Sequence, residues 1–440
     1  MRRNSSEHIL IITGLPFRKR GNQSLIRFVN MFLERDIEVI MFSAGYDPNG
    51  ENVLEDKKLE LYKIQSLEIY ITRILNKIFS KIRKKHEPFL DYFHNIKSED
   101  VIAPYGNYTF LNLLNKWVKW TLVLFDNIFL LIHILLKYRK KVQEASVIVG
   151  YEVNYTISSR ILSKLFKKKY INKFQGTILK ASNRDMKMAK KYFPHNLFGI
   201  NKSDLCLMVN DGTDGEYYAK LRGCEKIFFE PHGVFEYSNN EEQESQVKEF
   251  KKRGKFILFN NASGSTWKRT DRIIRALSKI EKGILKDITL FTTYFAADKE
   301  ALVKFVKDLN LSRNVVFWEG LDSVGCNNIL RKSDVVIMTN DFSNLGNPLL
   351  EAIYYKIPII SIDDGSLQGF LTDKRDSILV KLDESFDNNM AKAIERLYTD
   401  KALGSSMRKN LNKKSQVREL GEQQRSEERR VGKECRSRWS

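Results

Sequence analysis

Cysteine is scarce in this 440-residue chain, and its four cysteines lie far apart in the sequence. Cys206, Cys224, Cys326 and Cys435 form no CxxC pair, so the sequence supports neither a disulfide framework nor a zinc site. A reducing cytoplasm is the expected environment. The basic N-terminus runs directly into a strand-like pattern at residues 8–14, without the apolar stretch and cleavage site of a signal peptide.

The sequence also lacks an uninterrupted apolar run of the roughly 20 residues that a membrane-spanning helix needs. Its most apolar segment, residues 111–142, contains Lys119, Asp126 and His133. We expect this segment to form a long helix or a pair of helices, packed in the first domain or lying on a bilayer. Residues 62–94 place apolar and basic residues at helical spacing, which predicts a basic amphipathic helix. A solvated face over a core is slightly favoured over membrane binding for that helix.

Charge is plentiful and unevenly distributed. The net charge is +20, and residues 1–200 carry 34 lysines and arginines against 18 acids. A basic surface on the first half would suit nucleic acid, an anionic membrane leaflet or phosphorylated substrates. Charge alone does not choose among these partners.

Strand-like and helix-like segments alternate along the chain, which predicts parallel sheets covered by helices on both faces. The acidic segment 236–246 marks a domain boundary, giving an N-terminal domain at 1–236 and a C-terminal domain at 237–416. Residues 417–440 turn charge-dense without any period and resemble translated adapter sequence. We expect them to be a non-native or disordered tail that stands in place of a native C-terminal helix.

One loop-to-helix junction in the second half has the features of a phosphate site. The strand-like residues 334–340 are followed by a loop with Gly346 and by Pro348, which suits a first helical turn. In parallel sheets ligands bind where strands end, and the N–H groups at a helix start attract phosphate. Glu351 near this helix start could accept hydrogen bonds from ribose hydroxyls, or could simply complement the helix dipole.

The segment 343–361, SNLGNPLLEAIYYKIPIIS, resembles the retaining family-4 glycosyltransferases, of the glycosyl transferases group 1. That family has the GT-B fold, with two Rossmann-like doubly wound domains facing each other across a cleft. Glu351 matches the second glutamate of the family motif, whereas Ser343 replaces the first and Lys356 replaces the glycine before the proline of the next strand. The resemblance implies the following donor-binding residues: Ser343, Asn344, Leu345, Gly346, Asn347, Glu351 and Lys268.

A second match lies at residues 259–277, FNNASGSTWKRTDRIIRAL. Lys268 occupies the family's lysine position and could pair with a nucleotide diphosphate as a point charge. Arg269 replaces the usual glycine, and the family's upstream arginine has no obvious counterpart. The resemblance implies that Lys268 and Glu351 are the catalytic residues.

The first half carries weaker signals. In the loop 14–24, Gly21 and Asn22 at a helix start suit an anion, and three basic residues just before them add positive charge. Residues 173–179 match the family strand that often ends in a histidine, but Gln175 stands there and offers only hydrogen bonds. His232 lies in a turn that the family shares, and we interpret it as structural.

The resemblance implies transfer of a sugar from a nucleotide-diphosphate sugar to an acceptor sugar, with retention of configuration and with no cofactor or metal ion. The departing diphosphate would help to deprotonate the acceptor. The basic first half suggests a lipid-linked acceptor, with an anionic membrane surface contacted through residues 62–142. We therefore expect a cytoplasmic hexosyltransferase, peripheral on the inner face of the plasma membrane, that acts in polysaccharide or glycolipid assembly.

Three alternatives stay open at this point. A non-catalytic glycosyltransferase-like module would explain Ser343 and Gln175. A nucleotide-sugar epimerase also uses Rossmann-like domains but needs no acceptor. A nucleic-acid-binding protein would explain the charge, although the sequence contains no helix-turn-helix, zinc finger or RNP-like strand.

Overall fold

The computed structural model describes most of the chain between residues 8 and 417. The described ranges are 8–17, 22–44, 56–64, 92–101, 110–177, 179–209, 212–229, 241–262, 266–294, 299–319 and 323–417, with a few single positions between them. The described residues divide into two compact units. The first unit takes those up to 82 and from 105 to 233, and the second takes those in 83–104 and from 234 onward.

The first unit contains a parallel sheet of seven strands in the order β3-β2-β1-β4-β5-β6-β7. Its strands are β1 (His8–Thr13), β2 (Glu38–Ser43), β3 (Leu59–Lys63), β4 (Val147–Tyr151), β5 (Lys169–Phe174), β6 (Leu205–Met208) and β7 (Ile227–Phe229). Its helices are α1 (Gln23–Leu33), α4 (Phe110–Lys137), α5 (Arg139–Glu144), α6 (Thr156–Leu165), η1 (Leu179–Ser182), α7 (Met186–Tyr192), α8 (Pro194–Gly199) and α9 (Gly215–Leu221). The central strands are buried on both faces, as their apolar runs predict.

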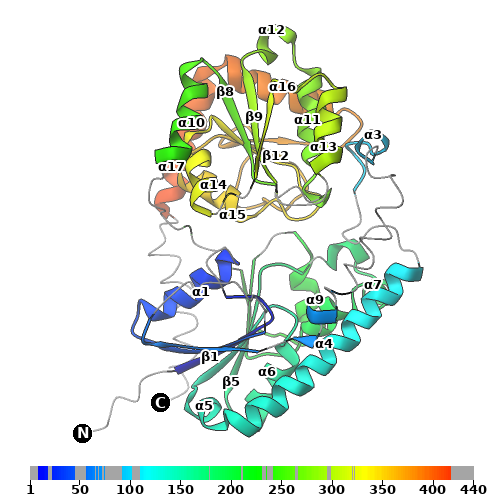
Figure 1. Ribbon diagram of the computed structural model, residues 1–440, viewed down its shortest axis with the longest axis vertical. Helices are drawn as coiled ribbons and strands as arrows, with labels where there is room; N and C mark the ends of the chain where they lie inside the picture. The colour runs from blue at the N-terminus through cyan, green and yellow to red at the C-terminus, as the bar shows by residue number, and fades with distance from the viewer. Residues whose placement is uncertain are drawn as a thin grey trace. The chain divides into compact units, whose positions relative to one another are not determined.

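The second unit contains a parallel sheet of six strands in the order β10-β9-β8-β11-β12-β13. Its strands are β8 (Phe256–Asn260), β9 (Ile288–Tyr294), β10 (Val315–Glu319), β11 (Val335–Met338), β12 (Ile359–Ile362) and β13 (Ser377–Val380). Its helices are α3 (Tyr92–Asn95), α10 (Glu241–Lys252), η2 (Thr266–Lys268), α11 (Thr270–Lys279), α12 (Lys282–Leu285), α13 (Lys299–Asp308), α14 (Ser323–Lys332), α15 (Asn347–Tyr354), α16 (Phe386–Thr399) and α17 (Lys401–Val417). Helices cover both faces of this sheet (Figure 1). The predicted α/β class with two doubly wound sheets is confirmed.

The helix expected at residues 62–94 is wrong at its start, because residues 59–63 form the edge strand β3. Two residues of the expected helix therefore belong to the sheet, and residues 75–91 lie outside the described part of the chain. The strand expected at 173–179 ends at Phe174, so Gln175 lies just beyond it. The acidic segment 236–246 runs into α10, and residues 418–440 lie outside the described residues.

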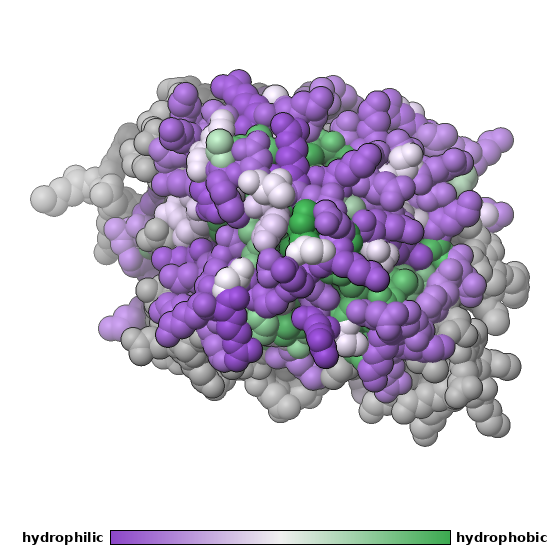
Figure 2. Space-filling model, turned by 90° about the horizontal axis from the view of Figure 1, so that it is seen from above, coloured by the Kyte–Doolittle hydropathy of each residue, from purple (hydrophilic) through white to green (hydrophobic). Residues whose placement is uncertain are grey.

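Of the long helix or pair of helices expected at residues 111–142, the structure shows a pair, the long helix α4 followed by the short α5. Among the helices that the structure describes, only α4 is long and apolar enough to cross a membrane, over Trp117–Lys137, and 33% of that window is buried. Its inner side packs into the core, and Asp126 is buried with the Leu67 N–H 2.9 Å from its carboxylate. Its outer side exposes apolar residues: Trp117, Val118, Phe125, Ile128, Phe129, Ile132 and Leu136. By contrast, the face of the molecule in Figure 2 is mostly hydrophilic.

Candidate functional site

The two segments that resemble the family, residues 259–277 and 343–361, follow neighbouring strands of the second unit. Lys268 lies in the segment after β8, and residues 343–347 lie in the loop after β11. These two strands pair in parallel, and the strand order reverses between them. Loops from two such strands separate at the carboxyl edge of an open sheet, which is where ligands bind in doubly wound folds.

Hydrogen bonds tie the two motifs together. The Asp341 N–H donates to the Trp267 carbonyl at 3.0 Å, and the Thr339 hydroxyl donates to the Arg269 carbonyl at 3.0 Å. Both bonds join the β11 loop to the residues on either side of Lys268. The structure thus brings together Lys268 and the loop that precedes α15, which the sequence separates by some 70 residues.

Lys268 has an environment suited to an anion. It is half-buried, and its Nζ lies 4.0 Å from the centroid of the Trp267 ring. Loss of hydration on burial lowers the pKa of Lys268 to about 8. A diphosphate would supply negative charge to a cation that has little solvent around it, so its binding would be favoured over that of a fully hydrated lysine.

The β11 loop is held by its own amides. The Asn340 N–H donates to Asn344 Oδ1 at 2.9 Å, and Asn344 Nδ2 donates to Asp364 Oδ2 at 3.0 Å. The Asn344 N–H donates to the Ser366 hydroxyl at 3.1 Å. Ser343 adopts the left-handed φ of +49°, and its carbonyl accepts from the Asn340 amide. The Asn344 side chain therefore shapes the loop, while Ser343, the residue in place of the family's first glutamate, occupies its turn.

Helix α15 begins as the sequence predicts. Gly346 is its N-cap in extended conformation, and Pro348 stands in its first turn. A Cβ at Gly346 would meet only ordinary contacts, at 3.6 Å from Pro348 and 4.0 Å from Met338. Neither backbone strain nor packing within the chain thus requires this glycine. Glu351 is buried in the second turn, beyond the first turn in which the helix dipole acts most strongly, and Leu345 is buried in front of the helix.

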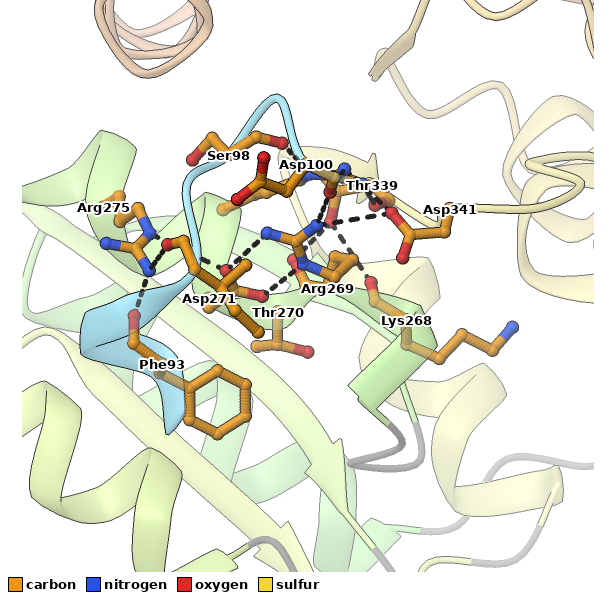
Figure 3. A network of polar contacts seen from close by, with 12 residues as sticks. Phe93, Ser98, Asp100, Lys268, Arg269, Thr270, Asp271, Arg275, Thr339 and Asp341 are labelled. Carbon is orange, nitrogen blue, oxygen red and sulfur yellow. Dashed lines mark hydrogen bonds and ion pairs between the residues drawn. The ribbon is translucent and has the colours of Figure 1, made fainter. Parts of the chain in front are cut away.

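Sequence reasoning missed Arg272 and the buried ion pairs that it and Arg269 form beside this site. Arg269 and Arg272 are fully buried and form ion pairs with Asp341, with N–O distances of 3.4 and 2.8 Å. Arg269 also forms a two-pronged ion pair with the buried Asp271, whose bonds are both 3.0 Å long (Figure 3). Two arginines and two aspartates thus lie here without solvent, next in sequence to Lys268. A signal was present in the motif KRTDR, but solvent-exposed charges at helix starts look the same in sequence.

In the first unit the structure brings Asn22 and Gln175 together. The Gln175 amide donates to Asn22 Oδ1 at 2.9 Å, and the same oxygen caps α1 by accepting from the Leu25 N–H at 3.0 Å. The Gln175 N–H donates to Glu152 Oε1 at 2.7 Å. Glu152, which follows β4, was not singled out from the sequence. Its place at a strand end was the available signal.

These three side chains lie at the carboxyl ends of β4 and β5 and at the start of α1, beside the point where the strand order of this sheet reverses. Gly21, the three basic residues before it and His232 lie outside the described residues. Among the residues that the structure describes, no three His, Cys, Asp or Glu side chains come together as metal ligands would.

Comparisons with known proteins agree with the fold. Residues 240–418 match the family described as glycosyl transferases group 1. The sucrose-phosphate synthase of Thermosynechococcus elongatus is similar in structure, with 13% identity, a TM-score of 0.69, and 98% of this chain and 100% of that chain covered. HepE of Anabaena in complex with UDP is 12% identical, with a TM-score of 0.64 and coverage of 97% and 99%. WaaG, a glycosyltransferase involved in lipopolysaccharide biosynthesis, is 13% identical, with a TM-score of 0.61 and coverage of 96% and 98%.

No curated protein matches the chain significantly in sequence. At these identities the structural similarity shows the fold alone, and that fold is the GT-B fold of glycosyltransferases. The family match covers both donor motifs of the second unit. The resemblance to the group 1 glycosyltransferases is thus confirmed.

Proposed function

We propose that this protein transfers a hexose from a nucleotide-diphosphate sugar to an acceptor sugar with retention of configuration. The chain has the GT-B fold, and its residues 240–418 belong to the glycosyl transferases group 1 family. The observation that carries this proposal is the hydrogen-bonded junction between the Lys268 segment and the β11 loop at the strand-order reversal. This junction joins a partly dehydrated cation to a loop that leads into a helix N-terminus, and both groups suit a diphosphate.

The donor would lie on the second unit. Lys268 would contact the diphosphate, the backbone of residues 343–347 would approach the sugar and phosphate, and Glu351 would accept hydrogen bonds from the ribose. The glycine at 346 supports this placement because nothing within the chain requires it. HepE, of similar fold, was solved with UDP, which makes UDP-sugars the first donors to test.

The proposed reaction uses the donor's own leaving group. The bond between the anomeric carbon and the diphosphate oxygen breaks, and the acceptor oxygen bonds to that carbon on the same face. The acceptor's proton passes to the departing phosphate oxygen. Lys268 stabilises the charge that develops on that diphosphate, and stabilisation of this kind contributes strongly to catalysis when the group is fixed in advance. This scheme requires no protein-bound metal ion.

The acceptor would bind to the first unit near Asn22 and Gln175. Their linked amides at the ends of β5 and the start of α1 can donate to and accept from sugar hydroxyls. Glu152, whose carboxylate accepts the Gln175 N–H, adds negative charge, so the site suits a neutral sugar better than it suits an acid. The positive charge of residues 1–200 supports an acceptor that also carries phosphate, such as a lipid-linked oligosaccharide.

We further propose that α4 holds the protein on an anionic membrane, with a cytoplasmic location. Its exposed apolar residues recur every three or four positions and so share one face, and the first 200 residues carry most of the net charge. WaaG, of similar fold, is involved in lipopolysaccharide biosynthesis, which supports polysaccharide or glycolipid assembly. Sedimentation with vesicles containing phosphatidylglycerol should fall at least fivefold for Phe129→Ser with Ile132→Ser. Leu221→Ser, an equally exposed site on α9, is the control, and equal binding of all three proteins would contradict the proposal.

The test of the transferase itself is binding and turnover across UDP-, GDP- and ADP-sugars. We expect one donor to bind and to be turned over with a suitable acceptor, and Lys268→Ala and Glu351→Ala each to weaken its binding about 10- to 100-fold, as expected for loss of a charge-assisted hydrogen bond. Lys282→Ala on the exposed helix α12 is the matched lysine control. Failure of every donor to bind a folded protein would contradict the proposal.

Turnover and product configuration separate the proposal from its rivals. The anomeric configuration of the product, read by NMR, tests retention. Binding without any transfer would favour the non-catalytic module, for which the departure at Ser343 is the structural argument. Conversion of the sugar in the absence of acceptor would favour an epimerase.

A further inference from the structure

Residues 92–101 belong in sequence to the first half of the chain but pack on the second unit. Phe93 is buried in the core of that unit, with its ring 6.1 Å from that of Phe305 on α13. His94 Nε2 lies 3.0 Å from Asp308 Oδ2. Ser98 is buried and donates to Asp387 at the start of α16. We call residues 92–101 the strap, and Figure 1 shows its helix α3 beside α13.

Three arginines of the second unit bind the backbone of the strap. Arg269 is the N-cap of α11, and Arg272 and Arg275 lie about one turn apart within that helix, so these two share one side of it. Together the three arginines donate to five strap carbonyls, those of Phe93, Ile96, Lys97, Ser98 and Asp100. The bond from Arg272 Nε to the Ser98 carbonyl is 2.7 Å long. The arginines therefore contact the strap through its backbone, while Phe93, His94 and Ser98 hold it through their side chains.

Two of these arginines also hold the β11 loop. Arg272 donates to the Thr339 carbonyl at 2.8 Å and pairs with Asp341 at 2.8 Å. Arg269 pairs with Asp341, and its backbone carbonyl accepts a hydrogen bond from the Thr339 hydroxyl. Arg275 contacts the strap and Asp271. In Figure 3 the Arg269 side chain lies between Asp271 and Asp341, and Arg275 lies beside Phe93 of the strap.

The arrangement costs free energy unless every bond is made. Arg269 and Arg272 are fully buried, and desolvation together with repulsion from Arg269 lowers the pKa of Arg272 to about 10. Arg269 also adopts the left-handed φ of +51°, a conformation that suits glycine and that a larger residue holds only when its surroundings fix it. Without the strap carbonyls, several buried N–H groups would lack acceptors, and such groups are expensive to leave unsatisfied.

We propose that the strap is a positioning element of the donor site: by completing the hydrogen bonding of Arg269 and Arg272, it fixes Lys268 and the β11 loop in the arrangement that binds a nucleoside diphosphate. This inference rests on the proposed donor site. It makes a stretch of the first half of the sequence part of the binding machinery of the second unit. A strap that only stabilised the fold would leave the binding of that unit unchanged once it had folded.

Two variants loosen the strap without touching the loop. Arg275→Gln removes the bonds to Phe93 and Ile96, and Phe93→Ala removes the strap's anchor in the core. Asp341→Asn weakens the arginine contact at the loop end and leaves the strap carbonyls in place. Lys279→Gln, on the exposed side of the same helix, is the matched control. All are made in the full chain.

We expect hydrogen exchange of strap amides to rise in Arg275→Gln and Phe93→Ala, and the Kd for UDP to rise about fivefold in each. Asp341→Asn should raise it about tenfold, and Arg275→Gln combined with Asp341→Asn should raise it no further, because both act through one chain of contacts. Lys279→Gln should match the wild type. A loosened strap with unchanged Kd, or effects of the two substitutions that multiply, would overturn the proposal.

A second readout needs no ligand. Lys268 lies over the Trp267 ring, so loss of the Lys268 proton should change the fluorescence of Trp267. The variant Trp267→Phe identifies the part of the signal that comes from this tryptophan. In the wild type the midpoint should lie near pH 8, and loosening the strap should move it upward by about one pH unit as Lys268 gains water. If no nucleoside diphosphate binds the wild type, the donor site is wrong, and this midpoint still decides whether the strap positions Lys268. An unchanged midpoint in both strap variants would overturn the positioning role.

Discussion

Each unit contains a parallel sheet whose strand order reverses once, between β1 and β4 in the first unit and between β8 and β11 in the second. The loops at these two points are held in different ways. In the first unit neutral amides join Asn22 to Gln175. In the second unit buried ion pairs join Arg269 and Arg272 to Asp341. At the reversal of strand order, the loops are therefore joined by neutral hydrogen bonds in one unit and by buried ion pairs in the other.

This difference fits two kinds of ligand. A nucleoside diphosphate is a constant, highly charged group, and fixed charges around its site reduce the reorganisation needed to bind it. An acceptor sugar offers hydroxyls, which linked amides can both donate to and accept from. The contrast predicts that substitutions in the second unit will cost far more stability than similar substitutions in the first.

The largest expected effect follows from Asp271→Ala. This change removes the buried partner of Arg269 and Arg275, and loss of one member of a buried pair costs about 3–5 kcal/mol. Hydrogen exchange in increasing urea, read on peptides of the second unit, measures this cost separately from the first unit. A loss below about 1 kcal/mol would show that the charges of this unit are not the fixed network inferred here.

The next effect is a pH dependence of donor binding. With its pKa near 8, Lys268 carries its proton below that pH and loses it above. Since a diphosphate binds the charged form, affinity should be full below pH 8 and should fall up to tenfold per pH unit above it. Calorimetric Kd values from pH 6.5 to 9.5 measure the fall, and Lys268→Arg should abolish it because arginine stays charged. A flat profile in the wild type would remove Lys268 from the site.

The smallest effects are expected in the first unit. Asn22→Ala should lower the free energy of unfolding by about 1 kcal/mol, the usual cost of losing an N-cap. Gln175→Ala should raise the acceptor KM several-fold and leave the donor KM unchanged. Steady-state kinetics with each substrate varied in turn checks this split. A change confined to the donor KM would show that Gln175 acts on the donor and would contradict its place in the acceptor site.

The sequence predicted the elements that carry strong local patterns. Apolar runs such as Phe256–Asn260 and Val335–Met338 are buried on both faces and could be recognised as parallel strands. Pro348 marked the start of α15 because its fixed φ suits a first helical turn. Strand β3 escaped because it is an edge strand whose residues are only half-buried, and its alternation merges into the helical pattern that follows.

The strap could not have been found from the sequence. Its contacts with Arg269, Arg272 and Arg275 are made by backbone carbonyls, which every residue has, so no side-chain pattern marks them. Its partners lie about 170 residues away. The arginines themselves read as exposed charges on a helix face, because burial of charge depends on tertiary contacts that no local window contains.

The account rests most directly on where a nucleoside diphosphate binds. A crystal structure of the full chain with UDP, or with whichever nucleotide the donor panel selects, would answer this in one measurement. The account predicts the diphosphate within hydrogen-bonding distance of Lys268 Nζ and the start of α15, with the ribose hydroxyls at Glu351. A nucleotide bound elsewhere, with Lys268 still lying over Trp267 and the β11 loop empty, would contradict it.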